Sequence, residues 1–377
     1  MALRAHGPLK QMGGSFDKQA QERIAKQQES VLRGRVSGCL EKSVRSRARF
    51  REALRAWFGV AGKDYPWRRT RDPYAVLVSE LMLQQTRLAT VLEKRHYVRF
   101  MERFPDVKSL ALADDESLLK AWEGLGYYRR ARMLREAARA ILQDHGGTMP
   151  SGLAALRSLP GIGEYTANAM RAFAFDAPAV VVDGNIARVL ARLADLHEEI
   201  DSGAGKRAIH ELAGLLADDG HPRAYHSALM ELGQQLCKVG APMCAECPVS
   251  GFCKAENPSS LPMKRPRVGI TKVVEHAIWR RRDGAVLLHR AGGARRTGLW
   301  HLPVRTEDEV SGMKELLVTR YPITRYSVEL RVWSDVTSSA SLREGECWIR
   351  MDEVDGLAMA TPMRRALMRL LEEKNRM

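Results

Sequence analysis

The sequence predicts a mainly α-helical domain that ends in a loop of four cysteines and is followed by a smaller α+β domain. Three observations support this fold class. Apolar residues recur at three- and four-residue spacings from about residue 49 to residue 236. Four closely spaced cysteines follow, and short β-branched segments begin after a proline-rich stretch. With 377 residues, each of the two domains can bury its own hydrophobic core.

The first 48 residues predict a basic, disordered N-terminal arm. Residues 1–50 contain eleven Lys or Arg and four Asp or Glu, which is about half of the chain's net charge of +15. The sequence leaves open whether this arm adds affinity for phosphates or is a dispensable extension. The pI of about 9.8 predicts a polyanionic partner, most simply nucleic acid. No apolar run approaches the roughly 20 residues of a membrane-spanning helix.

The pattern of residues 49–236 predicts helices that are separated by short turns containing Gly, Pro and Asp. Only residues 179–182 predict extended chain. The strongest helical patterns cover residues 49–58, 73–87, 118–122, 130–143, 164–174 and 185–193.

The cysteine loop has the pattern C-x6-C-x2-C-x5-C, formed by Cys237, Cys244, Cys247 and Cys253. Four thiolates on one compact loop can hold a cube-type iron–sulfur cluster. A structural zinc site is the competing interpretation, but such sites usually pair two C-x2–4-C knuckles, and only one is present. Disulfide bonds fit less well, because the other two cysteines are scattered and the N-terminus is not typical of a secreted protein.

After the cysteines, residues 256–270 predict a proline-rich, basic linker. Short β-branched segments with turn signals follow at residues 273–280, 285–289, 326–336 and 347–350, and a helical pattern closes the chain at residues 361–373. Residues 271–377 therefore predict a small α+β domain.

A glycine-rich turn, Leu159-Pro160-Gly161-Ile162-Gly163, lies between two predicted helices. Two glycines around an aliphatic residue allow a tight turn whose backbone N–H groups point outward at a helix N-terminus. Such a turn can bind one DNA phosphate, which positions a protein on the duplex without reading its sequence. An ordinary helix–helix turn is the alternative that the pattern leaves open. The candidate phosphate-binding residues are Leu159, Gly161 and Gly163.

This turn, followed by Ala-Pro at 177–178, Val-Val-Val-Asp-Gly-Asn at 180–185 and the cysteine loop, resembles the helix-hairpin-helix DNA glycosylase superfamily that includes endonuclease III. The resemblance covers about residues 49–255. A finer resemblance to MutY-type adenine DNA glycosylases rests on residues 66–68, 73–74, 79–86, 124–132 and 182–185. It implies a [4Fe-4S] cluster at residues 237–253, double-stranded DNA as partner, and removal of adenine mispaired with 8-oxoguanine or guanine by a monomer.

Two carboxyl groups are the candidate catalytic groups. Glu80 lies in the apolar run of a predicted helix, where burial would raise its pKa as a general acid requires. A surface glutamate is the alternative. Asp183 precedes Gly184 and a predicted helix, so it can be an N-cap, and helix-end N–H groups would keep it ionised. The resemblance implies that Glu80 protonates N7 of adenine and that Asp183 faces the oxocarbenium-like sugar.

The resemblance also implies roles for residues near these carboxyl groups. Tyr165 matches a position that flanks the active site, and Asn185 matches one that orients the water or the aspartate. Trp67, Arg68 and Glu231 match positions near the adenine pocket, although each can equally be a core or surface residue.

Two further residues match positions that enter the duplex beside the opposing purine once the target base is extruded, namely Gln84 and Tyr127. An amide can hydrogen-bond at base edges, and an aromatic ring can stack; a packed tyrosine at a helix start is the alternative for Tyr127. We expect the arginines among residues 128–132 to contact DNA phosphates.

Two other functions stay open. A bifunctional glycosylase/lyase of the endonuclease III type needs a lysine just after the hairpin to form a Schiff base, and this chain has Tyr165 there. A non-catalytic iron–sulfur DNA-binding or redox protein would need neither Glu80 nor Asp183. We therefore expect a monofunctional hydrolase, in the bacterial cytoplasm or in the nucleus if the source is eukaryotic.

In the C-terminal domain, Arg-Arg-Thr-Gly-Leu-Trp-His-Leu-Pro at 295–303 resembles a segment of the Nudix-like domain that MutY enzymes use to check for 8-oxoguanine. The paired glutamates of a working Nudix hydrolase are absent, so no pyrophosphatase activity is expected. The family's recognition loop reads Phe-Ser-His, whereas residues 324–329 read Thr-Arg-Tyr-Ser-Val-Glu. Ser327 can keep one hydrogen bond, but the histidine is missing.

Overall fold

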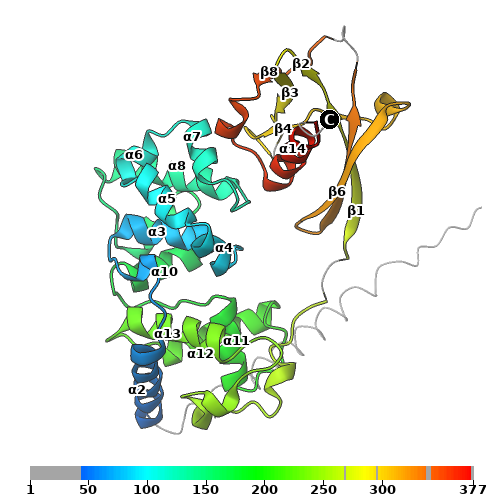
Figure 1. Ribbon diagram of the computed structural model, residues 1–377. Helices are drawn as coiled ribbons and strands as arrows, with labels where there is room; N and C mark the ends of the chain where they lie inside the picture. The colour runs from blue at the N-terminus through cyan, green and yellow to red at the C-terminus, as the bar shows by residue number, and fades with distance from the viewer. Residues whose placement is uncertain (1–43, 267–268, 294–295, 337–340, 375–377) are drawn as a thin grey trace, which may run out of the picture. The chain divides into compact units, whose positions relative to one another are not determined.

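The computed structural model of this chain describes residues 44–266, 269–293, 296–336 and 341–374 (Figure 1). Most of the predicted arm lies outside the described residues. The chain forms two compact units that each combine two segments. The first unit contains residues 44–63 and 176–265, and the second contains residues 64–175 and 266–377. The linear domain boundaries that the sequence suggests stay a prediction. No helix within the described ranges is long and apolar enough to cross a membrane.

The first unit is helical and carries the cysteine loop. Its core includes Phe50, whose ring meets the rings of Tyr225 and Phe252 edge to face at centroid distances of 6.5 and 5.7 Å. Since Phe252 belongs to the cysteine loop, this contact anchors the loop on the helices. The helices are α2 (Val44–Ala61), α11 (Gly184–Leu193), α12 (Gly203–Leu216) and α13 (Pro222–Gln235), and the 3-10 turns are η2 (Cys244–Glu246), η3 (Ser250–Phe252) and η4 (Pro258–Ser260).

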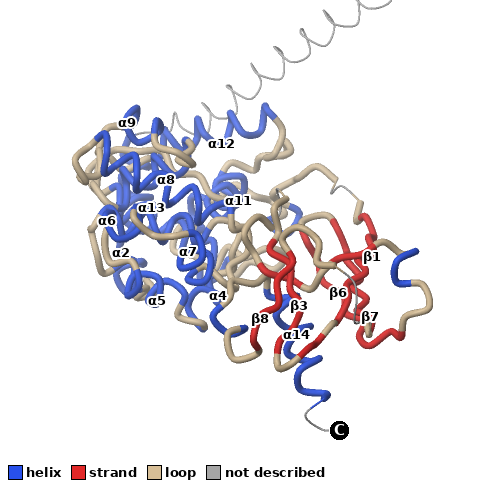
Figure 2. Tube along the Cα trace, turned by 90° about the horizontal axis from the view of Figure 1, so that it is seen from above, coloured by secondary structure: helices blue, strands red, loops and turns tan. Residues whose placement is uncertain are grey.

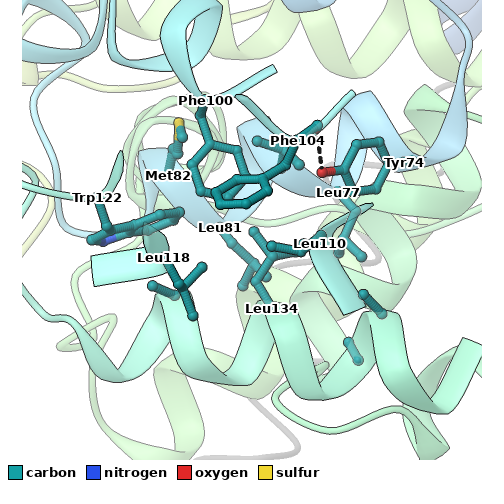
Figure 3. Packing of buried hydrophobic residues seen from close by; sticks show 14 of the residues in the cluster. Tyr74, Leu77, Leu81, Met82, Phe100, Phe104, Leu110, Leu118, Trp122 and Leu134 are labelled. Atoms are coloured by element: carbon teal, nitrogen blue, oxygen red, sulfur yellow. Dashed lines mark hydrogen bonds between the residues drawn. The ribbon is translucent and has the colours of Figure 1, made fainter. Parts of the chain in front are cut away.

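The helical part of the second unit surrounds one helix, α3 (Pro73–Leu83). The Tyr74 hydroxyl, at one end of this core, donates to the Phe104 carbonyl over 2.8 Å (Figure 3). The other elements are η1 (Pro66–Arg68), α4 (Leu88–Glu93), α5 (His96–Arg103), α6 (Val107–Ala111), α7 (Asp115–Ala121), α8 (Arg129–Asp144), α9 (Leu153–Ser158) and α10 (Glu164–Phe173).

Helix α3 begins and ends for local reasons. The carboxylate of Asp72 accepts hydrogen bonds from the N–H groups of Tyr74 and Ala75, and Pro73 occupies the first helical position. Every residue from position 74 to position 82 is buried, so the helix crosses the core. It ends at Leu83, because Gln85 takes a left-handed conformation with φ of 55°. The prediction of one helix over residues 73–87 is therefore wrong in its last turn.

The C-terminal region forms two small sheets, which Figure 2 shows in red beside α14 (Thr361–Lys374). One sheet has the order β5-β1-β7-β6, in which β1 and β7 are parallel, and the other places β3 between β4 and β8, with β2 also paired to β3. The strands are β1 (Thr271–Trp279), β2 (Arg281–Arg282), β3 (Ala285–Arg290), β4 (Trp300–His301), β5 (Val304–Arg305), β6 (Lys314–Ile323), β7 (Tyr326–Ser334) and β8 (Glu346–Arg350).

The α+β fold of this region is as predicted, but the sequence reading missed β6. This strand starts with two charged residues and contains Pro322, which is typical of non-strand segments. Proline is tolerated here because β6 lies at the edge of its sheet. The predicted extended segment at residues 179–182 is irregular rather than a strand.

Side chains between α7 and α8 contact the C-terminal region. Arg364 of α14 pairs with Glu123, and the Tyr128 hydroxyl donates to the Met359 carbonyl over 2.9 Å. Leu299 and Ala358 complete the hydrophobic core of the helical part. Most buried apolar side chains of the C-terminal region form clusters of their own, and these few contacts connect it to the helices.

Candidate catalytic and DNA-binding site

Glu80 lies in the middle of α3 and is only 8% exposed. The surface-glutamate alternative is therefore wrong. The Tyr165 hydroxyl on α10 donates a hydrogen bond to Oε2 of Glu80 over 3.2 Å. This contact places the two residues that the resemblance singled out side by side, and the hydroxyl can orient the carboxyl group that a general acid needs.

A second polar pair joins the same two helices one turn further along α3. The side-chain amide of Gln84 donates to Oγ1 of Thr166 over 3.1 Å. Gln84 is the C-cap of α3, and its side chain is partly buried. The amide is thus held by one neutral hydrogen bond, which a base edge could replace at small cost.

Tyr127 is exposed to 47%, and its backbone is left-handed with φ of 46°. Non-glycine residues with such a φ are uncommon and carry strain that often marks functional positions. Gly124 and Gly126, with φ of 94° and 68°, shape the loop that presents it. The exposure excludes the alternative of a packed tyrosine.

Two of the arginines expected to contact phosphates have other partners. Arg130 points inward and donates to carbonyl groups at the end of α3. Arg132 donates to the Thr297 carbonyl of the C-terminal region. Only Arg129 of this run is exposed. The phosphate role predicted for residues 128–132 is therefore corrected for Arg130 and Arg132.

The two candidate residues of η1 are tied to aromatic neighbours. Trp67 is buried, stacks on Tyr65 at a centroid distance of 5.3 Å and meets Tyr97 edge to face. The guanidinium of Arg68 lies over the Tyr65 ring at 4.6 Å. Trp67 thus belongs to the hydrophobic core, as its alternative interpretation allowed.

The glycine-rich turn connects α9 to α10, which confirms the helix–turn–helix arrangement. Leu159 is buried, and its carbonyl accepts from the N–H of Ile162 over 3.1 Å. Gly161 has φ of 75°, while Gly163 is the N-cap of α10 with φ of −84°. The first N–H groups of a helix have no acceptor within the helix, so the exposed end at Gly163 suits an anion.

The two glycines are expected to respond differently to alanine. Gly161→Ala places a Cβ 2.5 Å from the Cβ of Met133 at a left-handed φ, so we expect the free energy of unfolding to fall by about 1–3 kcal/mol. Gly163→Ala meets no atom within 4 Å, so stability should be unchanged while affinity for DNA falls. Urea unfolding and salt-dependent DNA binding measure the two effects. Equal losses of stability would contradict the assignment.

Asp183 lies in the first unit and caps α11. Its Oδ1 accepts from the N–H of Ile186 over 2.7 Å, and its Oδ2 accepts from the Asn185 amide over 2.8 Å. Burial raises the pKa of Asp183, and these two hydrogen bonds act in the opposite direction. The helix-end donors that the sequence predicts are present, but desolvation outweighs them, so the pKa of Asp183 lies above its ordinary value. That this carboxyl is ionised stays a prediction.

Arg188, which sequence reasoning missed, connects Asn185 to the cysteine loop. Its guanidinium donates to Oδ1 of Asn185 over 3.0 Å, to the Gly233 carbonyl over 2.8 Å and to the Cys237 carbonyl over 2.8 Å. The available signal was a charge on an apolar helix, three residues after Asn185. Glu231, fully buried on α13, accepts from the amide of Gln235.

The cysteine loop keeps four thiols without a disulfide bond, and burial, with the other three thiols adding to it, raises the pKa of Cys247 to about 11. Arg192 is buried, and its Nη1 donates to Sγ of Cys237 over 3.1 Å. Within the described ranges, no group of three or more His, Cys, Asp or Glu side chains is arranged to hold a single metal ion. Four free thiols in one loop are the kind of donor set that an iron–sulfur cluster takes.

Ser327 lies on β7, opposite Lys272 of β1 and Pro322 of β6, and is partly buried. The turn before it contains Thr324 with a left-handed φ of 53° and Arg325, whose guanidinium lies over the Tyr326 ring. The segment matched to the recognition loop is therefore the tip of the β6–β7 hairpin.

The candidate residues fall into two groups within the two units. The second unit holds Glu80, Tyr165, Gln84, Tyr127, the hairpin, Trp67, Arg68 and Ser327, and the first holds Asp183, Asn185, Glu231 and the four cysteines. In each group a carboxyl is oriented by a neutral hydrogen-bond donor.

Comparisons with known proteins support one family. Residues 78–214 match the HhH-GPD superfamily of base excision DNA repair proteins, a range that contains Glu80, the hairpin and Asp183. The adenine DNA glycosylase of Mus musculus is 40% identical over 243 residues, which are 62% of this chain and 47% of that protein. The adenine DNA glycosylase of Arabidopsis thaliana is 33% identical over 344 residues, which are 78% of this chain and 54% of that protein.

The chain spans about half the length of these curated relatives. A match that covers 78% of the chain includes more residues than positions 1–265 contain. The likeness to the Arabidopsis protein therefore extends into the C-terminal region. Among solved structures, a thermostable thymine-DNA glycosylase is 29% identical with a TM-score of 0.49, covering 56% of this chain and 96% of that one.

Proposed function

Since the chain belongs to the HhH-GPD superfamily of base excision DNA repair proteins, we propose that it is a monofunctional adenine DNA glycosylase. Its substrate is double-stranded DNA that contains adenine opposite 8-oxoguanine or guanine. The observation that carries this proposal is the buried carboxyl of Glu80 with the Tyr165 hydroxyl on its Oε2. A buried carboxyl group held in this way suits proton donation to a leaving base.

Adenine is a poor leaving group, and its glycosidic bond breaks through a sugar with oxocarbenium character. In the proposed reaction, Glu80 donates a proton to N7 of adenine, and the electrons of the glycosidic bond leave with the base. Asp183, as a carboxylate, stabilises the positive sugar, and Asn185 orients that carboxylate. Water then adds to the anomeric carbon and its proton passes to the Glu80 carboxylate, which restores the acid and leaves an abasic site.

The proposal of a hydrolase without lyase activity rests on Tyr165. A lyase requires an amine that attacks the sugar, and the position after the hairpin carries a phenol instead. A phenol cannot form a Schiff base. Borohydride trapping of a covalent protein–DNA adduct would favour the endonuclease III type.

We also propose that the four cysteines hold a [4Fe-4S] cluster. The thiols are free and lie in one loop that η2 and η3 fold back on itself. When bound, such a cluster supplies a rigid crosslink, and a redox role does not follow from the contacts described. The loop carries exposed Lys238 and Lys254, which suit phosphate contacts beside it.

The C-terminal α+β region is proposed to examine the base opposite adenine with the tip of the β6–β7 hairpin around Ser327. Because no histidine stands in residues 324–329, we expect a weaker preference for 8-oxoguanine over guanine than a complete Phe-Ser-His loop would give. We propose that the protein acts as a monomer. We also propose that it acts in the compartment that contains the DNA, which is the cytoplasm in a bacterium or the nucleus in a eukaryote.

The proposal is tested by single-turnover adenine release from duplexes with adenine opposite 8-oxoguanine, guanine or cytosine. We expect release from the first two and none after Asp183→Asn, because an amide cannot neutralise the sugar cation. Release unaffected by this substitution would contradict the mechanism. Tight binding of all three duplexes without release would support the non-catalytic DNA-binding alternative instead.

The pH dependence of release is expected to follow Asp183. Its pKa is raised, and only the carboxylate is active, so activity is present above this pKa and lost as the pH falls through it. Asn185→Ala removes a hydrogen bond that lowers the pKa, so the acidic limb of the rate profile should move to higher pH. Asn257→Ala, at an exposed amide of the same unit, is the control. If the acidic limb of the rate profile does not move in Asn185→Ala, the role given to Asn185 is contradicted.

A further inference from the structure

Arg130 on α8 has more hydrogen-bond partners than a surface arginine would. Its side chain is partly buried, and its guanidinium lies near the rings of Trp122 and Tyr127, 5.5 and 5.6 Å from their centroids. Nη1 donates to the carbonyls of Leu81, over 2.9 Å, of Met82, over 3.0 Å, and of Gln84. Nη2 donates to Oγ1 of Thr86 over 3.0 Å and to the carbonyls of Leu125 and Gly126 over 3.1 and 3.2 Å.

These acceptors belong to two segments that lie far apart in the sequence. The carbonyls around residue 82 are among the last of α3, which have no partner within the helix and favour a positive charge. The carbonyls of Leu125 and Gly126 belong to the loop just before Tyr127. One guanidinium therefore joins the backbone that carries Gln84 to the backbone that carries Tyr127.

Both segments have a strained backbone that a contact with a neighbouring side chain can stabilise. Gln85 and Tyr127 have left-handed backbones, with φ of 55° and 46°. Conformations of this kind persist only where the surroundings hold them. Arg130 supplies donors to the backbone on both sides of this strained pair, while the Gln84 side chain itself donates to Oγ1 of Thr166 on α10.

We propose that Arg130 is a positioning residue that fixes Gln84 and Tyr127 relative to each other before DNA binds. This inference rests on the proposed function, because it assumes that both side chains enter the duplex. Two groups held in advance lose less conformational freedom on binding, so extrusion of the target base costs less. Arg130 itself touches neither the base nor the sugar.

Lysine cannot replace arginine in this role. The planar guanidinium presents donors on two nitrogens in a fixed fork, one facing each segment, whereas an ammonium group is a single point. Burial also lowers the pKa of Arg130 to about 10, which shows how far the group is withdrawn from water. Arg130→Lys therefore keeps a charge but loses one side of the bridge.

Amide hydrogen exchange of the free protein tests the bridge without DNA. We expect Arg130→Lys to speed exchange in residues 82–87 and also in residues 124–128, with the rest of the second unit unchanged. The matched control is Arg135→Lys, a buried arginine of the same helix that donates to the Ala113 carbonyl and pairs with Asp115. Faster exchange in one segment only, or the same pattern in the control, would overturn the bridge.

Adenine release separates positioning from chemistry. With adenine opposite guanine, Arg130→Lys should slow single-turnover release by about a hundredfold. With adenine opposite an abasic site, where extrusion is easier, the loss should be severalfold smaller. A double-mutant cycle should show that Gln84→Ala costs less in Arg130→Lys than in the wild type. Equal losses on both duplexes, or additive effects, would overturn the proposal.

Failure of the inference differs from failure of the proposed function. If the wild type releases no adenine, the proposed function fails, and the exchange experiment still decides whether the bridge exists. If Arg130→Lys does not fold, Thr86→Val removes one acceptor on the α3 side with little change of volume. It should speed exchange in residues 82–87 and lower release in the same direction, and no change in either measurement would overturn the proposal.

Discussion

Glu80→Gln is expected to slow single-turnover adenine release by about 10²–10⁴-fold, the range in which general acid catalysis contributes. The amide keeps the size of the side chain and can still accept from the Tyr165 hydroxyl, so the helix should fold. It has no proton to donate to N7 of adenine. Release from a duplex with adenine opposite guanine, followed by rapid quench, measures the loss.

Two controls sharpen this result. Glu116→Gln removes an exposed carboxylate from α7 and should leave the rate unchanged. Tyr165→Phe removes the hydroxyl that orients Glu80 but leaves its proton, so its cost should fall well below that of Glu80→Gln. Full activity in Glu80→Gln, with Asp183→Asn inactive, would show that the base leaves without this acid and would contradict the role given to Glu80.

The helical fold could be predicted because hydrophobic periodicity is a local signal, whereas the resemblance to a known family singled out the two carboxyl groups. Glu80 is a single charge in an apolar run, and Asp183 precedes a glycine and a helix. Hydrophobic periodicity alone marks a buried helix, and a charge inside it needs a reason. The structure describes that reason as a hydroxyl from another helix, which no spacing in the sequence contains.

The arginines could not be predicted in the same way. Arg130 and Arg132 stand in a basic run, and a basic run in a DNA-binding chain favours phosphate contacts. Several of their acceptors are carbonyls more than forty residues away in the chain, at the end of α3 and before β4. Which carbonyls lack partners depends on where helices end, and the end of α3 was itself predicted four residues too late.

The raised pKa of Asp183 also depends on the tertiary structure and not on local sequence. The N-cap bonds are local and predictable, and they lower the pKa. Burial is a property of the whole unit, and it dominates. The sequence therefore predicts the N-cap hydrogen bonds correctly but not the raised pKa, because desolvation depends on packing that only the folded chain determines.

Cys247→Ser is expected to remove the bound iron and to destabilise the first unit by several kcal/mol, since the free energy of binding such a group is also free energy of folding. Contacts with the helices also hold the loop. Arg192 donates to Sγ of Cys237, Sγ of Cys253 contacts the Arg192 carbonyl over 3.4 Å, and Phe252 packs on Phe50. Iron content, visible absorption and thermal unfolding measure the loss.

The matched control is Cys347→Ser, which changes an exposed, free thiol on β8 in the other unit and should leave iron and stability unchanged. Loss of the loop should also weaken DNA binding and slow release, because Arg188 takes the Cys237 carbonyl as one of its acceptors while it holds Asn185. Loss of the loop would then act on Asp183 indirectly, through Arg188 and Asn185. If Cys247→Ser binds zinc with full stability and activity, the loop is a zinc site, and the iron–sulfur assignment is wrong.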